Sequence, residues 1–138
     1  MPLFEQVLDK YPDSVRIVFK HYPLSFHKQA LPAALAAMAA GEQGKFWEYH
    51  DELFLYQSSL SSQKYMEIAQ NMDLDLKKFS LDRMRPSLRN KIEQDIADAQ
   101  KAGLTGTPTI FVNGRKLKKR DFGSLSKLID SELAKFQQ

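Results

Sequence analysis

The chain of 138 residues contains no cysteine. It therefore forms no disulfide, no thiolate metal site and no thiol nucleophile. A long apolar run is also lacking. The longest uncharged apolar stretch, residues 30–40, contains Pro32, whereas a membrane-spanning helix needs about 18 or more apolar residues. Glu5 and Asp9 interrupt any apolar region of the kind that a signal peptide carries, so we expect neither a membrane span nor a signal peptide within this sequence.

The sequence also lacks a large net charge. The net charge of +3 and the isoelectric point near 9.1 are too modest to indicate nucleic-acid binding, which needs basic residues gathered on one face. Hydrophobic residues make up 43% of the chain and charged residues 27%. This balance is typical of one globular domain with a single core.

Hydrophobic periodicity predicts a helix, a strand, a block of helices, a hairpin and a last helix. Residues 3–8 form the first helix, which Pro12 ends, and residues 14–22 are predicted as a strand. The first helix of the block can begin as late as Leu31, which places Pro32 in its first turn. The predicted helices of the block are residues 27–40, 45–56, 62–72, 75–84 and 87–102.

The last third of the chain predicts a hairpin and a helix. Asn113-Gly114 is a strong two-residue hairpin signal between strands at residues 109–112 and 115–117, and Asp121 is a cap for the final helix. One strand and a distant hairpin do not make a complete sheet. We therefore expect a partner strand to be missing, with its natural place before Met1.

The segment Gly103-Leu104-Thr105-Gly106-Thr107-Pro108-Thr109 joins the end of a helix to a strand, a position that favours a cis bond before Pro108. This loop with its hairpin resembles the cis-proline loop of DsbA-like thioredoxin-fold proteins. Val15-Arg16-Ile17-Val18-Phe19-Lys20, continuing through Tyr22-Pro23-Leu24-Ser25-Phe26-His27, is similar to the family's strand and first inserted helix. Residues 39–54 are similar to its second inserted helix, so the resemblance covers nearly the whole chain.

The resemblance implies an α/β thioredoxin-like fold: one domain over residues 1–138, incomplete at its N-terminus, with a helical insertion over residues 27–102. The family consists of protein disulfide oxidoreductases, but the first strand and the Cys-x-x-Cys pair have no counterpart here. Carried over from the family, Thr107 and Pro108 bind an extended polypeptide substrate or partner protein. No cofactor is implied, and the full-length relatives would be periplasmic or extracytoplasmic.

Three functions stay open. The gene product is an oxidoreductase of which this chain is a shortened version; or it is a cysteine-free paralogue that binds peptides or scaffolds a complex; or it is an isomerase or glutathione-binding enzyme on the same fold. In each case an exposed sheet edge invites pairing with another chain, so we expect a homodimer, or a sheet closed by its two remaining strands.

Other residues have simpler interpretations. His21, His27 and His50 lack metal-ligand spacing, so no metal site is predicted. The aromatic stripe around Trp47 is interpreted as core instead of a peptide groove. The basic run 115–120 could contact an anionic partner, but protection of a strand edge is the favoured interpretation.

Overall fold

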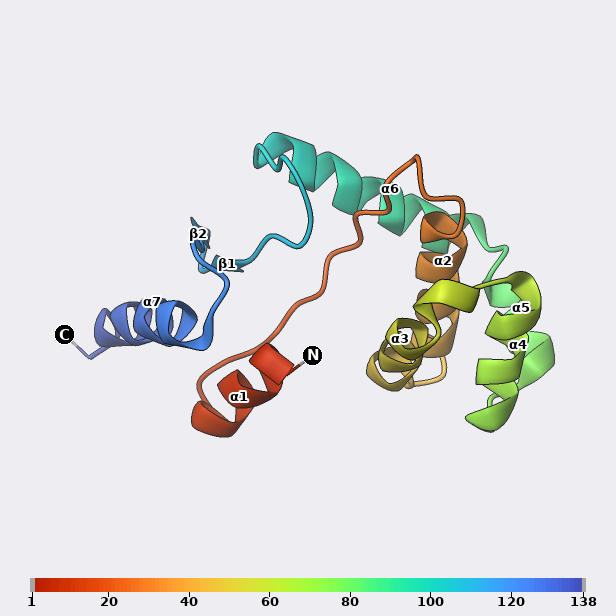
Figure 1. Ribbon diagram of the computed structural model, residues 1–138, viewed down its shortest axis with the longest axis horizontal. Coiled ribbons are helices and arrows are strands. Elements are labelled where there is room, and N and C mark those ends of the chain that lie inside the picture. The colour runs from red at the N-terminus through yellow and green to blue at the C-terminus, as the bar shows by residue number, and fades with distance from the viewer. Residues whose placement is uncertain (1, 138) are drawn as a thin grey trace. The chain divides into compact units, whose positions relative to one another are not determined.

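The structure is a computed structural model that describes residues 2–137, so Met1 and Gln138, the ends of the predicted domain, lie outside the described residues. Its contacts divide the chain into two units (Figure 1). One unit combines Met1–Phe19 with Leu104–Gln138, and the other is Lys20–Gly103. The second unit, called the helical unit below, spans the insertion that the sequence predicts.

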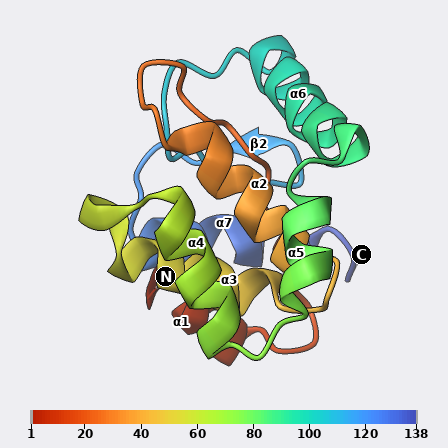
Figure 2. The same cartoon turned by 90° about the vertical axis from the view of Figure 1, so that its right-hand side faces the viewer.

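The helical unit contains five α-helices and a short 3-10 turn among the described residues (Figure 2). All the predicted helices are present, and the first begins three residues later than the earlier of its two predicted starts, so that Pro32 lies in its first turn. The elements are α2 (Ala30–Gly41), α3 (Phe46–Leu55), η1 (Gln57–Ser59), α4 (Ser62–Asn71), α5 (Leu76–Asp82) and α6 (Pro86–Lys101).

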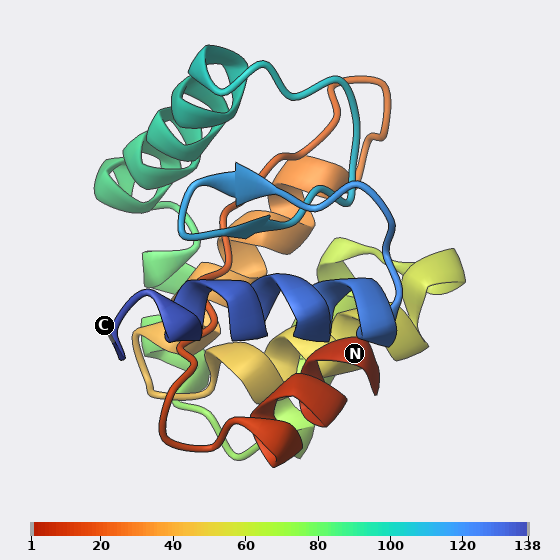
Figure 3. The same cartoon turned by 90° about the vertical axis from the view of Figure 1, so that its left-hand side faces the viewer.

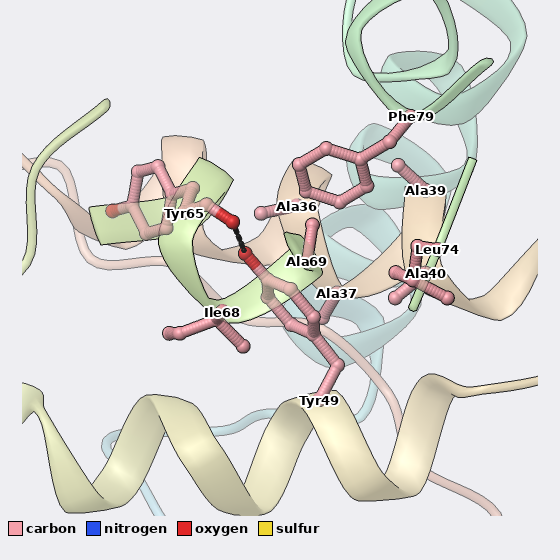
Figure 4. Packing of buried hydrophobic residues seen from close by; sticks show 10 residues of the cluster. All are labelled: Ala36, Ala37, Ala39, Ala40, Tyr49, Tyr65, Ile68, Ala69, Leu74 and Phe79. Carbon is pink, nitrogen blue, oxygen red and sulfur yellow. Dashed lines mark hydrogen bonds between the residues drawn. The ribbon is translucent and has the colours of Figure 1, made fainter. Parts of the chain in front are cut away.

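The alanine-rich helix α2 contacts α3, α4, α5 and α6. Its buried residues are all alanines, whose small side chains allow neighbouring helices to approach closely. Larger side chains from the neighbours complete this core, and the hydroxyl of Tyr49 donates to the carbonyl oxygen of Tyr65 at 2.9 Å (Figure 4). The buried cluster is Ala36, Ala37, Ala39, Ala40, Tyr49, Tyr65, Ile68, Ala69, Leu74 and Phe79.

Helix ends in this unit follow their sequence signals. Ser61 accepts a hydrogen bond from the Lys64 N–H at 3.1 Å, and Asp75 accepts one from the Lys78 N–H at 3.0 Å. Both are side-chain caps of the kind that satisfies the free N–H groups of a first turn. Gly103, with φ of +74°, follows the end of α6 in a conformation that favours glycine.

The other unit, called the hairpin unit below, consists of α1 (Pro2–Lys10), β1 (Phe111–Val112), β2 (Arg115–Lys116) and α7 (Phe122–Ala134). The strands pair antiparallel around Asn113 and Gly114, whose φ angles are 50° and 82°, as a type I′ turn requires. Helix α7 packs against α1 and β1 (Figure 3). The buried residues of this core are Val7, Tyr11, Leu117, Leu125 and Ile129.

The strand predicted at residues 14–22 is wrong. Residues 15–24 form neither helix nor strand (Figure 1). Val15 and Ile17 are partly buried while Arg16 and Val18 are exposed, so the burial alternates as it does in a strand. A β-ladder also needs a neighbouring strand, and no strand within residues 2–137 forms a ladder with this segment.

Asp95, a buried residue of α6, attaches the first residues of the helical unit. Its Oδ2 accepts the backbone N–H of His21 at 3.0 Å, and its Oδ1 accepts from Lys91 Nζ at 2.7 Å. Lys20 Nζ lies 3.8 Å from the same carboxylate. These donors compensate the desolvation of a side chain that is only 1% exposed.

We predict that Asp95→Ala lowers the free energy of unfolding by about 3 kcal/mol, because it leaves the His21 N–H and the Lys91 ammonium without their buried acceptor. Urea unfolding followed by circular dichroism measures the change. The matched control is Asp98→Ala on the same helix, where the carboxylate is 40% exposed and should matter much less. Equal losses in the two variants would contradict the role given to Asp95.

Candidate functional site

The loop between α6 and β1 holds both predicted site residues. Thr107 and Pro108 are exposed, and the peptide bond between them is cis, the isomer that the sequence analysis expects. Thr109 closes the loop on itself, because its Oγ1 donates to the carbonyl oxygen of Gly106 at 2.7 Å. The hydrogen bond therefore holds Thr107 and Pro108 just before the start of β1.

Strand β1 has one free edge. The Leu117 N–H donates to the Ile110 carbonyl at 2.8 Å, so Ile110 and Leu117 are a hydrogen-bonded pair of the ladder. In an antiparallel ladder such pairs alternate with non-bonded ones. The next pair, Phe111 opposite Lys116, is therefore a non-bonded pair. The backbone N–H and C=O groups of Phe111 point to the outer edge of β1, and those of Lys116 point to the outer edge of β2.

The two outer edges differ in charge. The β2 edge carries Arg115 and Lys116, both exposed, and cations of this kind discourage strand addition. The β1 edge carries no charged residue from Thr107 to Val112. Ile110 and Val112 pack on the core of the hairpin unit together with Val15 of the unpaired segment. The β1 edge thus lacks the charges that discourage strand addition at the β2 edge.

A cluster of polar side chains joins α1 to α7, although no pattern in the sequence predicts it. The hydroxyl of Tyr11 lies 2.7 Å from Ser126 Oγ and donates to Asp130 Oδ1 at 2.6 Å, while Lys10 Nζ donates to Ser126 Oγ at 2.5 Å. The hydrogen bond with Tyr11, together with Asp130, raises the pKa of Lys10. A lysine that keeps its proton cannot activate Ser126 as a base would, so the cluster acts as a link between the two helices.

The three histidines differ in burial. His21 and His50 are both buried, and burial lowers the pKa of each, to about 4 for His21. His27 is exposed. Within the described part of the chain, no three His, Cys, Asp or Glu side chains are placed to hold a metal ion together.

The aromatic stripe of α3 divides between core and surface. Tyr49 is fully buried, and Phe46 is partly buried against the same core. Trp47 and Phe54 are 43% and 55% exposed. The interpretation of the stripe as core therefore holds for Tyr49 and Phe46 but not for Trp47 and Phe54.

Comparison with known proteins identifies the family. The model of the thioredoxin family matches residues 2–131. The chain belongs to the thioredoxin family. A thioredoxin-like oxidoreductase from Silicibacter pomeroyi DSS-3 superposes with a TM-score of 0.82 and 27% identity, over 97% of this chain and 77% of that one. The oxidoreductase DsbA from Xylella fastidiosa has the same fold, with a TM-score of 0.71 and 22% identity over 95% of this chain and 78% of its own. The predicted DsbA-like thioredoxin fold is thus confirmed.

Curated relatives carry a different name. Na(+)/H(+) antiporter NhaA 3 of Salinispora tropica is 41% identical over 116 residues, which are 83% of this chain and 18% of the antiporter. The NhaA antiporter of Herminiimonas arsenicoxydans is 35% identical over 108 residues, 78% of this chain and 17% of its own length. The chain thus spans about a fifth of the length of these relatives. Among residues 2–137, no helix has both the length and the apolar character needed to cross a bilayer.

We predict that His21 makes the helical unit less stable in acid. Its pKa is about 4 in the folded chain, below the ordinary 6.5, because burial disfavours the charged ring, although Asp95 acts in the opposite direction. As the pH falls, His21 therefore takes up its proton in the unfolded chain before it does so in the folded chain. The free energy of unfolding keeps the full contribution of His21 above pH 6.5. At pH 4 this free energy is lower by about 3 kcal/mol.

Urea unfolding at a series of pH values measures this dependence. His21→Gln should weaken it, whereas His27→Gln, at an exposed position, should leave it unchanged. An unaltered pH profile in His21→Gln would show that other groups cause the acid sensitivity.

Proposed function

We propose that this chain supplies the polypeptide-binding part of a DsbA-like thiol–disulfide oxidoreductase and cannot itself transfer a disulfide. The observation that carries the proposal is the exposed Thr107–Pro108 loop, which leads into the uncharged free edge of β1 in a chain of the thioredoxin family. This is the part of the chain that offers unpaired backbone groups to an extended peptide.

An extended polypeptide would bind as an added strand. The N–H and C=O of Phe111 would pair with its backbone, and exposed Thr107 would extend the contact along the loop. Pro108 has no N–H and so presents no donor that lacks a partner. Because the contacts are made by backbone atoms, the site would favour an extended shape over one particular sequence.

Disulfide transfer needs an additional group. Exchange begins with attack by a thiolate on a disulfide sulfur, and this sequence has no cysteine. In the first version of the proposal, a segment encoded upstream provides the strand and the Cys-x-x-Cys pair; in the alternative, the chain is a cysteine-free paralogue that only binds or scaffolds. The DNA upstream of the Met1 codon distinguishes them, because an in-frame Cys-x-x-Cys favours the first and a nearby stop codon the second.

We predict no thiol–disulfide exchange by the chain as it stands, because it contains no thiolate. Insulin reduction by dithiothreitol, under metal-free conditions, is a suitable assay. The expected rate equals that of the reaction without protein. Turnover above that control would show that a thiol-independent chemistry had been overlooked.

We also propose that two copies of the chain pair through their β1 edges. The β2 edges are charged and should stay apart, whereas β1 edges present uncharged residues and free backbone groups. Antiparallel pairing across a two-fold axis would join two hairpins into one sheet, and it would cover the apolar side chains at that edge.

We predict a dimer in sedimentation velocity that Phe111→Pro dissociates, with a dissociation constant raised about tenfold or more by the lost N–H donors. Phe111 donates outward, so the hairpin itself should persist. The matched control is Lys116→Pro. The N–H of Lys116 points to the opposite edge, so this variant should dimerise as the unchanged chain does. Phe111→Ala separates loss of the ring from loss of the donor. A monomer at all concentrations, or equal effects at both edges, would contradict this pairing.

The named relatives support a second candidate function. Eight matched proteins are Na(+)/H(+) antiporters with 34–41% identity to this chain. We infer that the chain acts beside such a membrane transporter as its thioredoxin-like part. Upstream DNA that encodes membrane-spanning helices in the same frame would support this candidate, and a stop codon without such a neighbour would remove it.

A further inference from the structure

We propose that the segment Arg115–Arg120 binds the surface of an anionic lipid bilayer. Its cations, called the basic strip below, are Arg115, Lys116, Lys118, Lys119 and Arg120. The proposal rests on the second candidate function, because a domain that acts beside a membrane transporter works near a bilayer. It adds the surface of this chain that would face the lipid.

The basic strip concentrates the charge of the chain. The whole chain has a net charge of +3, whereas the strip carries five positive charges and no negative one. The rest of the chain is therefore slightly acidic. All five side chains are exposed, and none makes an ion pair with another described residue; Arg115 only donates to Ser131 Oγ at 3.4 Å. Several cations elsewhere form ion pairs, as Lys91 does with Asp95 and Arg85 with Asp82.

Protection of a strand edge explains only part of the strip. Arg115 and Lys116 lie on β2, where charges discourage strand addition. Lys118, Lys119 and Arg120 follow the end of β2 and protect no ladder. The presence of three cations beyond the strand therefore calls for another explanation.

Two anchors hold the strip in place. Leu117, in its middle, is buried and donates its N–H to Ile110 at 2.8 Å. Asp121, directly after it, accepts from the Ser124 N–H at 2.7 Å as the N-cap of α7. The hydrogen bonds with Ser124 hold the pKa of Asp121 below its usual range, and the charge of Lys119 lowers it further. The backbone that carries the cations is thus fixed in its middle and at its end.

A bilayer fits this arrangement because its charge is spread over a plane. Basic residues near an anionic surface each add about 1 kcal/mol of attraction, without the need for a shaped pocket. Phe111 stands opposite Lys116 in the ladder and is 38% exposed, so an apolar ring lies on the same face as a cation. Aromatic and cationic side chains together are typical of surfaces that contact the lipid headgroup region.

The test is cosedimentation of the whole chain with vesicles of phosphatidylcholine alone or mixed with phosphatidylglycerol. The chain should bind only the anionic vesicles, and binding should fall between about 0.15 M and about 1 M salt as the Debye length shrinks from about 8 Å to about 3 Å. Lys116→Gln/Lys118→Gln/Lys119→Gln should weaken the binding on the order of a hundredfold, since each cation contributes about fivefold.

The matched control changes the net charge equally at other places. Lys28→Gln/Lys45→Gln/Lys77→Gln removes three exposed lysines of the helical unit and should bind as the natural chain does. Equal loss in both triple variants, binding to neutral vesicles, or tighter binding to a DNA duplex than to the vesicles would overturn the proposal. The vesicles contain no transporter and the assay needs no peptide, so failure here leaves both candidate functions standing.

Discussion

The backbone groups of an extended segment need hydrogen-bonding partners, and this requirement decides what the hairpin unit can do. Strand β1 pairs with β2 along one edge, and the backbone N–H and C=O groups of Phe111 lie at its other edge. Residues 15–24 alternate in burial at Val15, Ile17 and Val18 but form no ladder with any strand of the described chain. Water can satisfy such groups, but it cannot cover the apolar side chains beside them. A second polypeptide strand can do both, which is the physical basis for proposing the β1 edge as a site for a polypeptide or for a second copy of the chain.

The helical unit pairs several of its buried polar groups internally. Asp95 receives the His21 N–H and the Lys91 ammonium, and the Tyr49 hydroxyl reaches the Tyr65 carbonyl inside the core. Buried polar groups that are paired in this way make a helical packing specific, since any other packing would leave them unpaired. The buried groups of this unit are thus paired within it, whereas the exposed loop and the β1 edge of the hairpin unit are the parts that we propose to contact partners.

The distribution of charge separates two kinds of partner. The uncharged β1 edge suits an extended polypeptide, and the cations that follow β2 suit an anionic surface. The two surfaces belong to one hairpin, whose Asn113–Gly114 turn and buried Leu117 fix both of them. In our proposals, the β1 edge holds an extended polypeptide while the neighbouring turn contacts anionic lipid.

Local signals in the sequence determined the helices and the turn. Asp121 as a cap, Gly103 as a helix end and Asn113–Gly114 as a hairpin were predictable because each acts within a few residues. The absence of cysteine determined that no thiol chemistry belongs to these residues. Only the tertiary structure decided that residues 15–24 remain without a ladder, that Tyr49 is core while Trp47 is exposed, and that Tyr11 meets Ser126 and Asp130. Each of these depends on partners distant in the chain, and hydrophobic periodicity records which side chains avoid water but not which neighbours they find.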